Sequence, residues 1–86
     1  MDVVNLDETA VGRFRHEPGW RWSADVAPVV GGEWCQLRHV GFVMAGRLHE
    51  VAEDGTTMEI GPGEAYEIPP GHDAWVVGGD PCRLLD

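Results

Sequence analysis

The chain has 86 residues, the size of one small domain, and a formal net charge of −9 from six Arg, no Lys and 15 Asp plus Glu. Nucleic acids and anionic membrane surfaces are bound largely through Lys and Arg, so this acidic surplus excludes both as expected partners. With 43% hydrophobic residues, the chain is expected to fold around a core.

Turn-forming residues divide the chain into short segments. The 12 Gly and 6 Pro leave stretches of roughly five to ten residues, which favour strands joined by turns. In chain order, strand-like composition occurs at residues 26–30, 40–44, 58–60 and 75–77, and Asp54-Gly55 predicts a hairpin between residues 46–53 and 56–60. No stretch keeps apolar residues at helical spacing over three turns, so no long helix is expected. Many short strands predict an all-β sandwich or barrel.

The cysteines and the N-terminus indicate the compartment. Residues 1–8 are acidic and lack the basic-then-apolar pattern of a signal peptide. The longest apolar stretch, around residues 42–45, is too short to span a membrane. Cys35 and Cys82 are too few for a secreted mini-protein and form no CxxC pair. We therefore expect a cytoplasmic protein with reduced cysteines.

Two glycine-containing stretches carry a recognisable spacing. Gly63 is followed by five residues and then by Pro69, Gly71 and His72, and 16 residues separate Gly46 from Gly63. These spacings resemble the two motifs of the cupin superfamily, whose members are small double-stranded β-helix barrels of jelly-roll type. The resemblance covers about residues 31–86 and implies that all-β fold. It implies little about activity, because cupins host many chemistries.

The resemblance also implies a metal site with altered ligands. Cupins usually bind a metal through three His and one acidic residue, the acidic one standing seven positions before the Gly that matches Gly46. In this sequence the corresponding positions hold Glu33, Cys35 and His39. In the second motif the family His would fall near Ala74, and His72 stands two positions before it. Carboxylate, thiolate and imidazole all bind metals, so the implied cofactor is one divalent ion. Mixed nitrogen and sulfur ligands favour Zn²⁺, whereas the family favours Fe²⁺ or Mn²⁺.

Cys35 and His39 can share a metal only if the chain reverses between them. On a straight strand they would stand roughly 13 Å apart, because a strand rises about 3.3 Å per residue. Cupins bend at this point, so the resemblance predicts a reversal across residues 36–38.

Each ligand candidate also has a simpler structural interpretation. Cys35 fits equally well as a small buried core residue. His39 fits a core His held by one hydrogen bond, and His72, after Pro-Pro-Gly, fits an exposed loop. Glu33, next to Gly-Gly, fits a solvated turn. The sequence leaves these alternatives open.

Aromatic residues provide candidates for a ligand pocket. Trp20 and Trp22 face the same way if they lie on a strand, with Arg21 opposite. They would form part of the core, a dimer interface, or an aromatic wall for a planar or apolar ligand. Tyr66 could present its hydroxyl to the same pocket.

These observations predict a small cupin that binds a divalent metal in its barrel and a small-molecule ligand beside it. Two alternatives remain open: a metal-dependent enzyme of dioxygenase, isomerase or lyase type, and a metal-free sensory or structural cupin. The sequence shows no nucleophile with a paired base and no carboxylate pair at catalytic spacing, so the catalytic residues are unknown.

The N-terminal segment predicts the assembly. Residues 1–24 are expected to form a strand or arm, and residues 25–86 the barrel. The arm carries Val11, Phe14, Trp20 and Trp22, for which so short a chain offers few β-partners. Since cupins commonly pair, we expect a homodimer with this arm at the interface.

Overall fold

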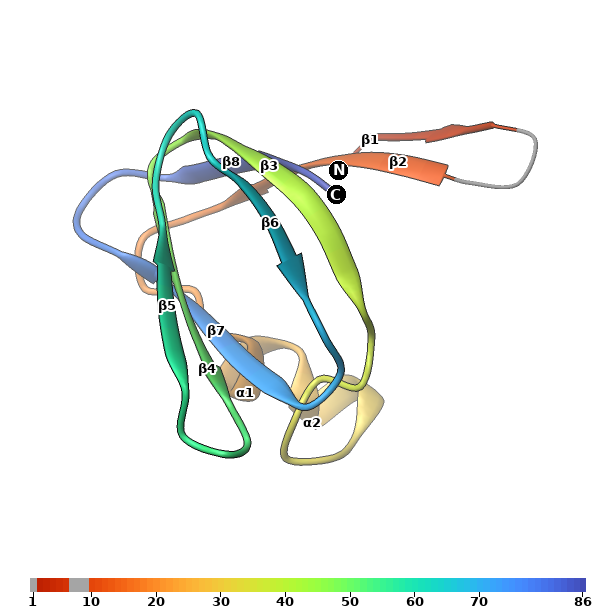
Figure 1. The fold of residues 1–86 in the computed structure, drawn as a ribbon, viewed down its shortest axis with the longest axis vertical. Coiled ribbons are helices and arrows are strands. Elements are labelled where there is room, and N and C mark those ends of the chain that lie inside the picture. The colour runs from red at the N-terminus through yellow and green to blue at the C-terminus, as the bar shows by residue number, and fades with distance from the viewer. Residues whose placement is uncertain (1, 7–9) are drawn as a thin grey trace.

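The computed structural model describes residues 2–6 and 10–86, which form strands and two four-residue helices (Figure 1). In chain order the elements are β1 (Asp2–Asn5), β2 (Ala10–His16), α1 (Trp22–Asp25), α2 (Ala27–Val30), β3 (His39–Ala45), β4 (Arg47–Ala52), β5 (Thr57–Ile60), β6 (Ala65–Ile68), β7 (His72–Val77) and β8 (Cys82–Leu85). Within the described part of the chain, no helix has the length and apolar character needed to cross a membrane.

The strands form two antiparallel sheets. One has five strands in the order β1-β2-β8-β3-β6, and the other has three in the order β5-β4-β7. Figure 1 shows the β1–β2 hairpin projecting away from the rest of the molecule, while α1 and α2 lie near the lower ends of β7 and β3. The expectation of a small all-β domain is therefore confirmed at the level of two antiparallel sheets.

The core lies between the sheets and follows the alternation of the strands. On β6, Tyr66 and Ile68 are buried while Ala65 and Glu67 are exposed. On β8, Cys82 and Leu84 are buried and Arg83 is exposed. The buried cluster contains Val43, Leu48, Ile60, Tyr66, Ile68, Ala74, Val76, Cys82 and Leu84.

The locally encoded strands and the hairpin are where the sequence predicts them. Residues 40–44 lie in β3, 58–60 in β5 and 75–77 in β7. Asp54 and Gly55 join β4 to β5. The Asp54 carboxylate accepts a hydrogen bond from the Thr56 amide at 2.9 Å, and Gly55 adopts a φ of 91° that favours glycine.

The strand expected in the segment before Cys35 is wrong. Residues 26–30 form a turn and α2 rather than a strand. Pro28 stands in the first turn of α2, a position that suits proline, and Val29 and Val30 are exposed without a neighbouring strand. Trp20 and Trp22 do not share a strand either, because Trp22 begins α1.

The second half of β2 and the segment that links it to the helices are tied to the two sheets. Residues Arg13 to His16 pair with β8, and the Trp20 carbonyl accepts a hydrogen bond from the Val76 amide at 3.0 Å. The Ser23 amide donates to the buried Asp73 carboxylate at 3.0 Å. The expected boundary between residues 24 and 25 thus falls within α1, and part of the N-terminal segment is built into the five-stranded sheet.

Candidate metal centre

Three of the predicted ligands come together. Cys35, His39 and His72 each offer one ligand atom, and these atoms lie within 4.8 Å of one another. We call these three residues the triad. Cys35 and His72 are buried, and His39 is half-buried. They come from three segments: the loop after α2, the start of β3 and the start of β7.

Backbone hydrogen bonds place Cys35 beside His72. The Cys35 amide donates to the His72 carbonyl at 2.7 Å, and the Gly71 amide donates to the Cys35 carbonyl at 2.8 Å. Residues 36–38 form no strand, and Cys35 Sγ lies 3.5 Å from His39 Nε2. Residues 36–38 are therefore not part of a straight strand, as a shared site requires, and His72 lies in the interior rather than on an exposed loop.

Each histidine is held through Nδ1. His72 Nδ1 donates to the Pro69 carbonyl at 2.9 Å, since a carbonyl can only accept. His39 Nδ1 donates to the Asp86 carboxylate, 3.1 Å from Oδ2 and 3.2 Å from Oδ1. A histidine with Nδ1 engaged in this way presents Nε2 as its metal-binding atom, and the partner fixes the orientation of the ring.

The same contacts give the two histidines different acidities. The hydrogen bond to Asp86 raises the pKa of His39 to about 9, against the effect of burial and with a further contribution from Cys35. Burial lowers the pKa of His72. Without a metal, His39 therefore carries a second ring proton, on Nε2, at neutral pH. An incoming metal must displace this proton.

Asp86 is a site residue that the sequence analysis missed. Its Oδ2 also accepts a hydrogen bond from the Tyr66 hydroxyl at 2.7 Å, so it connects Tyr66 to His39. Burial, followed by this hydrogen bond, raises the pKa of Tyr66 above its usual range, which keeps the hydroxyl a donor. Alternation along β8, beyond Leu84, was the available signal that Asp86 faces inward.

Gly41 makes room for this hydrogen-bond network. It lies opposite Tyr66 in the β3–β6 pair. A Cβ at Gly41 would clash with the Tyr66 hydroxyl and with the Leu85 carbonyl oxygen. Because Gly41 has no side chain, the Tyr66 hydroxyl can pass it and reach Asp86.

A cavity of about 250 Å³ adjoins the triad between the two sheets. Tyr66, Trp20 and Trp22, the residues predicted for a ligand pocket, all line it. The complete lining is Phe14, His16, Trp20, Trp22, Val26, Cys35, Leu37, His39, Leu48, Tyr66, Ile68, His72, Ala74, Leu84 and Asp86. Leu37, one of the lining residues, is 67% exposed.

Glu33, the fourth predicted ligand, does not join the triad. It lies in the bend between α2 and Cys35, and its side chain is exposed. Its position therefore corresponds to the solvated turn that the sequence left open as an alternative.

The triad is compatible with one metal ion. Zn²⁺ bonds of about 2.0 Å to nitrogen and 2.3 Å to sulfur place those ligand atoms about 3.5 Å apart. The Cys35–His39 separation of 3.5 Å has this value. Thiolate and imidazole ligands suit Zn²⁺, and zinc sites with three protein ligands leave a fourth position for water or another molecule.

Comparisons with known proteins show the fold alone. No protein-family profile matches the chain, and no curated protein matches it. The crystal structure of protein NMB1881 from Neisseria meningitidis is similar, with a TM-score of 0.67 over 98% of this chain and 76% of that one. The two sequences are 16% identical, so the similarity extends to the arrangement of the backbone.

Proposed function

We propose that this chain is a small cupin-type protein that binds one divalent metal ion, Zn²⁺ by preference, through Cys35 Sγ, His39 Nε2 and His72 Nε2. The observation that carries the proposal is the convergence of three ligand atoms within 4.8 Å, with both histidines held through Nδ1. A structural core would not require one buried and one half-buried imidazole to meet a buried thiol with their metal-binding atoms together.

Three observations support the cupin part of the proposal. The two antiparallel sheets match the two layers expected of a jelly roll. Gly63 and Gly71, the two glycines of the second motif, each adopt a positive φ, and they precede β6 and β7. His72, which follows that motif directly, belongs to the triad.

The open metal position and the adjoining cavity support binding of a small molecule. Such a molecule would complete the coordination of the ion while its remainder fills the space between the sheets. A reducing compartment such as the cytoplasm is part of the same proposal, because a thiolate ligand requires that Cys35 is not oxidised.

Elemental analysis of the purified, untagged protein tests the metal centre. We expect about one zinc per chain after exposure to Zn²⁺, and loss of that zinc in Cys35→Ala, His39→Ala and His72→Ala. His49→Ala is the matched control, since His49 is half-buried on β4 and outside the triad. Glu33→Ala should also keep its zinc. A folded protein that takes up no metal, or triad variants that retain it, would overturn the proposal.

A homodimer formed through the outer face of the five-stranded sheet is a further part of the proposal. Val4 pairs with Val11 on the projecting hairpin, and both side chains are exposed. Farther across the same sheet, Phe42 pairs with Leu85, which pairs in turn with Arg13 of the hairpin, and Phe42 is 39% exposed. Partly exposed apolar residues on a projecting hairpin and the adjoining sheet face favour contact with another protein surface.

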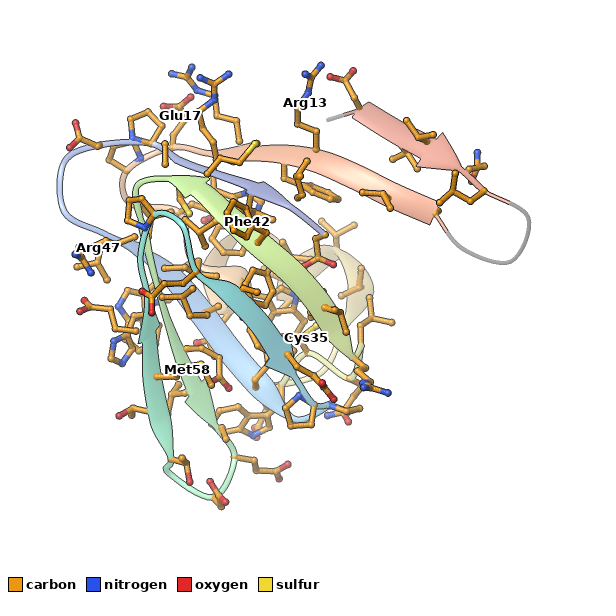
Figure 2. The ribbon with its side chains drawn as sticks, turned by 45° about the horizontal axis from the view of Figure 1, so that its top comes forward. Arg13, Glu17, Cys35, Phe42, Arg47 and Met58 are labelled. Carbon is orange, nitrogen blue, oxygen red and sulfur yellow. The ribbon has the colours of Figure 1, made fainter. Side chains whose placement is uncertain are left out.

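Charge favours a second copy of this chain as the occupant. Three exposed ion pairs, Arg13–Asp2, Arg15–Glu17 and Arg38–Glu67, lie on or beside this sheet, and Arg83 adds a fourth Arg. Figure 2 shows Arg13 and Glu17 pointing away from the three-stranded sheet. The rest of this acidic chain has two Arg. We therefore expect the outer face of the five-stranded sheet to repel the same face of a second copy less than the other faces of the molecule would.

Light scattering at micromolar concentration tests the assembly. We expect the mass of a dimer, and a monomer for Phe42→Glu with its zinc content unchanged. Met58→Glu is the matched control, because Met58 is 42% exposed but lies on β5 of the other sheet (Figure 2). A monodisperse monomer of the unmodified protein would overturn the dimer without affecting the metal centre.

A further inference from the structure

The cavity beside the triad has one polar end and a mostly apolar interior. The triad, Tyr66 and Asp86 supply a connected group of polar atoms, and His16 is a further polar residue of the lining, whereas Trp20, Trp22 and Leu48 are among its apolar side chains. A molecule with a metal-binding head group and an apolar body matches this division.

The volume limits the size of such a molecule. A cavity of roughly 150 Å³ accommodates benzene, which corresponds to about 25 Å³ per non-hydrogen atom. The 250 Å³ available here therefore accommodates about ten such atoms. Nucleotides and other large cofactors are too big for this space, while a single ring with a short head group fits it.

The charges around the triad favour a head group with one negative charge. A divalent ion bound to one thiolate and two neutral imidazoles leaves one positive charge at the metal. Asp86, which is hydrogen-bonded to His39 Nδ1, adds a negative charge beside the triad. This charge weakens the attraction of the site for a group with more than one negative charge. No Lys or Arg is among the described residues that line the cavity, so a second anionic group there would have no permanent positive charge as its partner.

The apolar wall favours a flat ring. Trp22 is buried and packs with Cys35, and Trp20 packs against this small cluster as well as the main core. His16 stacks on Trp20 with ring centroids 3.9 Å apart and an angle of 14° between the planes, which fixes the indole in place. Two ordered indoles favour an aromatic guest over a branched aliphatic one.

We propose that the cavity binds a compact aromatic monocarboxylate of about nine or ten non-hydrogen atoms, with its carboxylate in the open metal position and its ring against Trp20 and Trp22. This inference rests on the proposed metal centre. It names the class of molecule that the metal and the cavity together select.

Calorimetric titration of the zinc-loaded protein with benzoate tests the inference, with zinc measured in the same sample. We expect benzoate to bind at least ten-fold more tightly than acetate, which lacks the ring, and benzamide, which lacks the charge. Phthalate, with a second carboxylate, should also bind at least ten-fold more weakly. Cyclohexanecarboxylate keeps the head group but is not flat, and should bind several-fold more weakly.

A matched pair of variants tests the aromatic wall. Trp20→Leu keeps an apolar side chain but removes the indole, and should weaken benzoate binding about ten-fold without loss of zinc. Trp34→Leu changes a half-buried tryptophan outside the cavity lining and should leave benzoate binding unchanged.

The outcomes separate the two proposals. A sample with one zinc per chain that does not bind benzoate, or binds acetate or benzamide as tightly, overturns this inference and leaves the metal centre intact. Equal binding of benzoate to metal-free protein also overturns it, because the carboxylate would then not need the metal. A folded sample that takes up no metal overturns both.

Discussion

The two ends of the five-stranded sheet differ in what covers them. Around β3, β6 and β8 the inner face is buried beneath the other sheet, and His39, Tyr66 and Asp86 share a connected set of hydrogen bonds there. On β1 all four residues are exposed, and the Arg13–Asp2 pair has side chains 64% and 68% exposed. The same strand pairing thus produces a defined polar site only where a second layer excludes water.

Metal removal should have the largest effect on stability. This effect should be confined to the end of the five-stranded sheet that the other sheet covers (β3, β6 and β8), which we call the covered end. A ligand present at a thousand times its Kd stabilises the folded state by about 4 kcal/mol, so chelation should lower the free energy of unfolding by that amount. Hydrogen exchange should then accelerate in β3, β6 and β7 but not in β1. Equal acceleration in β1 would remove the distinction between the two ends.

The pH dependence of the metal-free protein should come from the covered end. The raised pKa of His39, about 9, means that the folded state binds this proton more tightly than the unfolded chain, whose His titrates near 6.5. The stabilisation is complete below pH 6.5 and is lost as pH rises through 9. We expect a loss of about 2 kcal/mol, allowing for solvent screening at a partly exposed ring.

Urea unfolding between pH 6.5 and 9.5 measures this slope, with His39→Gln as the control that should abolish it. The lowered pKa of His72 acts in the opposite direction, since protonation of a buried imidazole destabilises the folded state as pH falls below 6.5. Stability that rises steadily from pH 6.5 to 9.5 would contradict the role given to Asp86.

Matched valine substitutions compare the two ends by packing alone. Val43 on β3 is fully buried, and Val43→Ala should cost about 2 kcal/mol through lost contacts and a residual cavity. Val4 on β1 is 62% exposed, and Val4→Ala should change stability by less than about 0.5 kcal/mol in the isolated chain. Chemical denaturation measures both values. A similar cost at the two positions would show that the hairpin is buried in solution.

Asp86→Asn should have the smallest effect of the four. The amide oxygen still accepts a hydrogen bond from His39 Nδ1, but the charge is lost, and such partners of metal-bound histidines typically affect affinity at least ten-fold. We expect zinc affinity to fall about ten-fold in a competition titration with a chelator. Tyr66→Phe, which removes one hydrogen bond to Asp86, should change it less. An unchanged affinity in Asp86→Asn would contradict its positioning role.

Local patterns predicted those parts of the fold that depend on local chemistry. Asp54-Gly55 encodes its hairpin through turn geometry, and residues 40–44 encode a strand through β-branched and apolar side chains. Val29 and Val30 have the same local preference but no strand beside them, so α2 forms instead. Local preference therefore failed where tertiary context was missing.

The candidate site shows the same limit. The spacing of Cys35, His39 and His72 was enough to predict the triad, because the resemblance carried the required bend. Asp86 contacts His39 across 47 residues of sequence, and Leu84-Leu85-Asp86 alone does not distinguish a buried hydrogen-bond acceptor from a solvated carboxylate. Glu33 was included by the same spacing argument, yet it lies in an exposed bend.

The backbone bridge between Cys35 and His72 has a kinetic consequence. It closes a long loop that contains β3 to β6, so two of the three ligands meet only after that part of the chain has been ordered. Metal that binds this late cannot assist the rate-limiting encounter between distant strands. It should leave the folding rate nearly unchanged and slow unfolding instead, so that the ion acts chiefly on the lifetime of the native state.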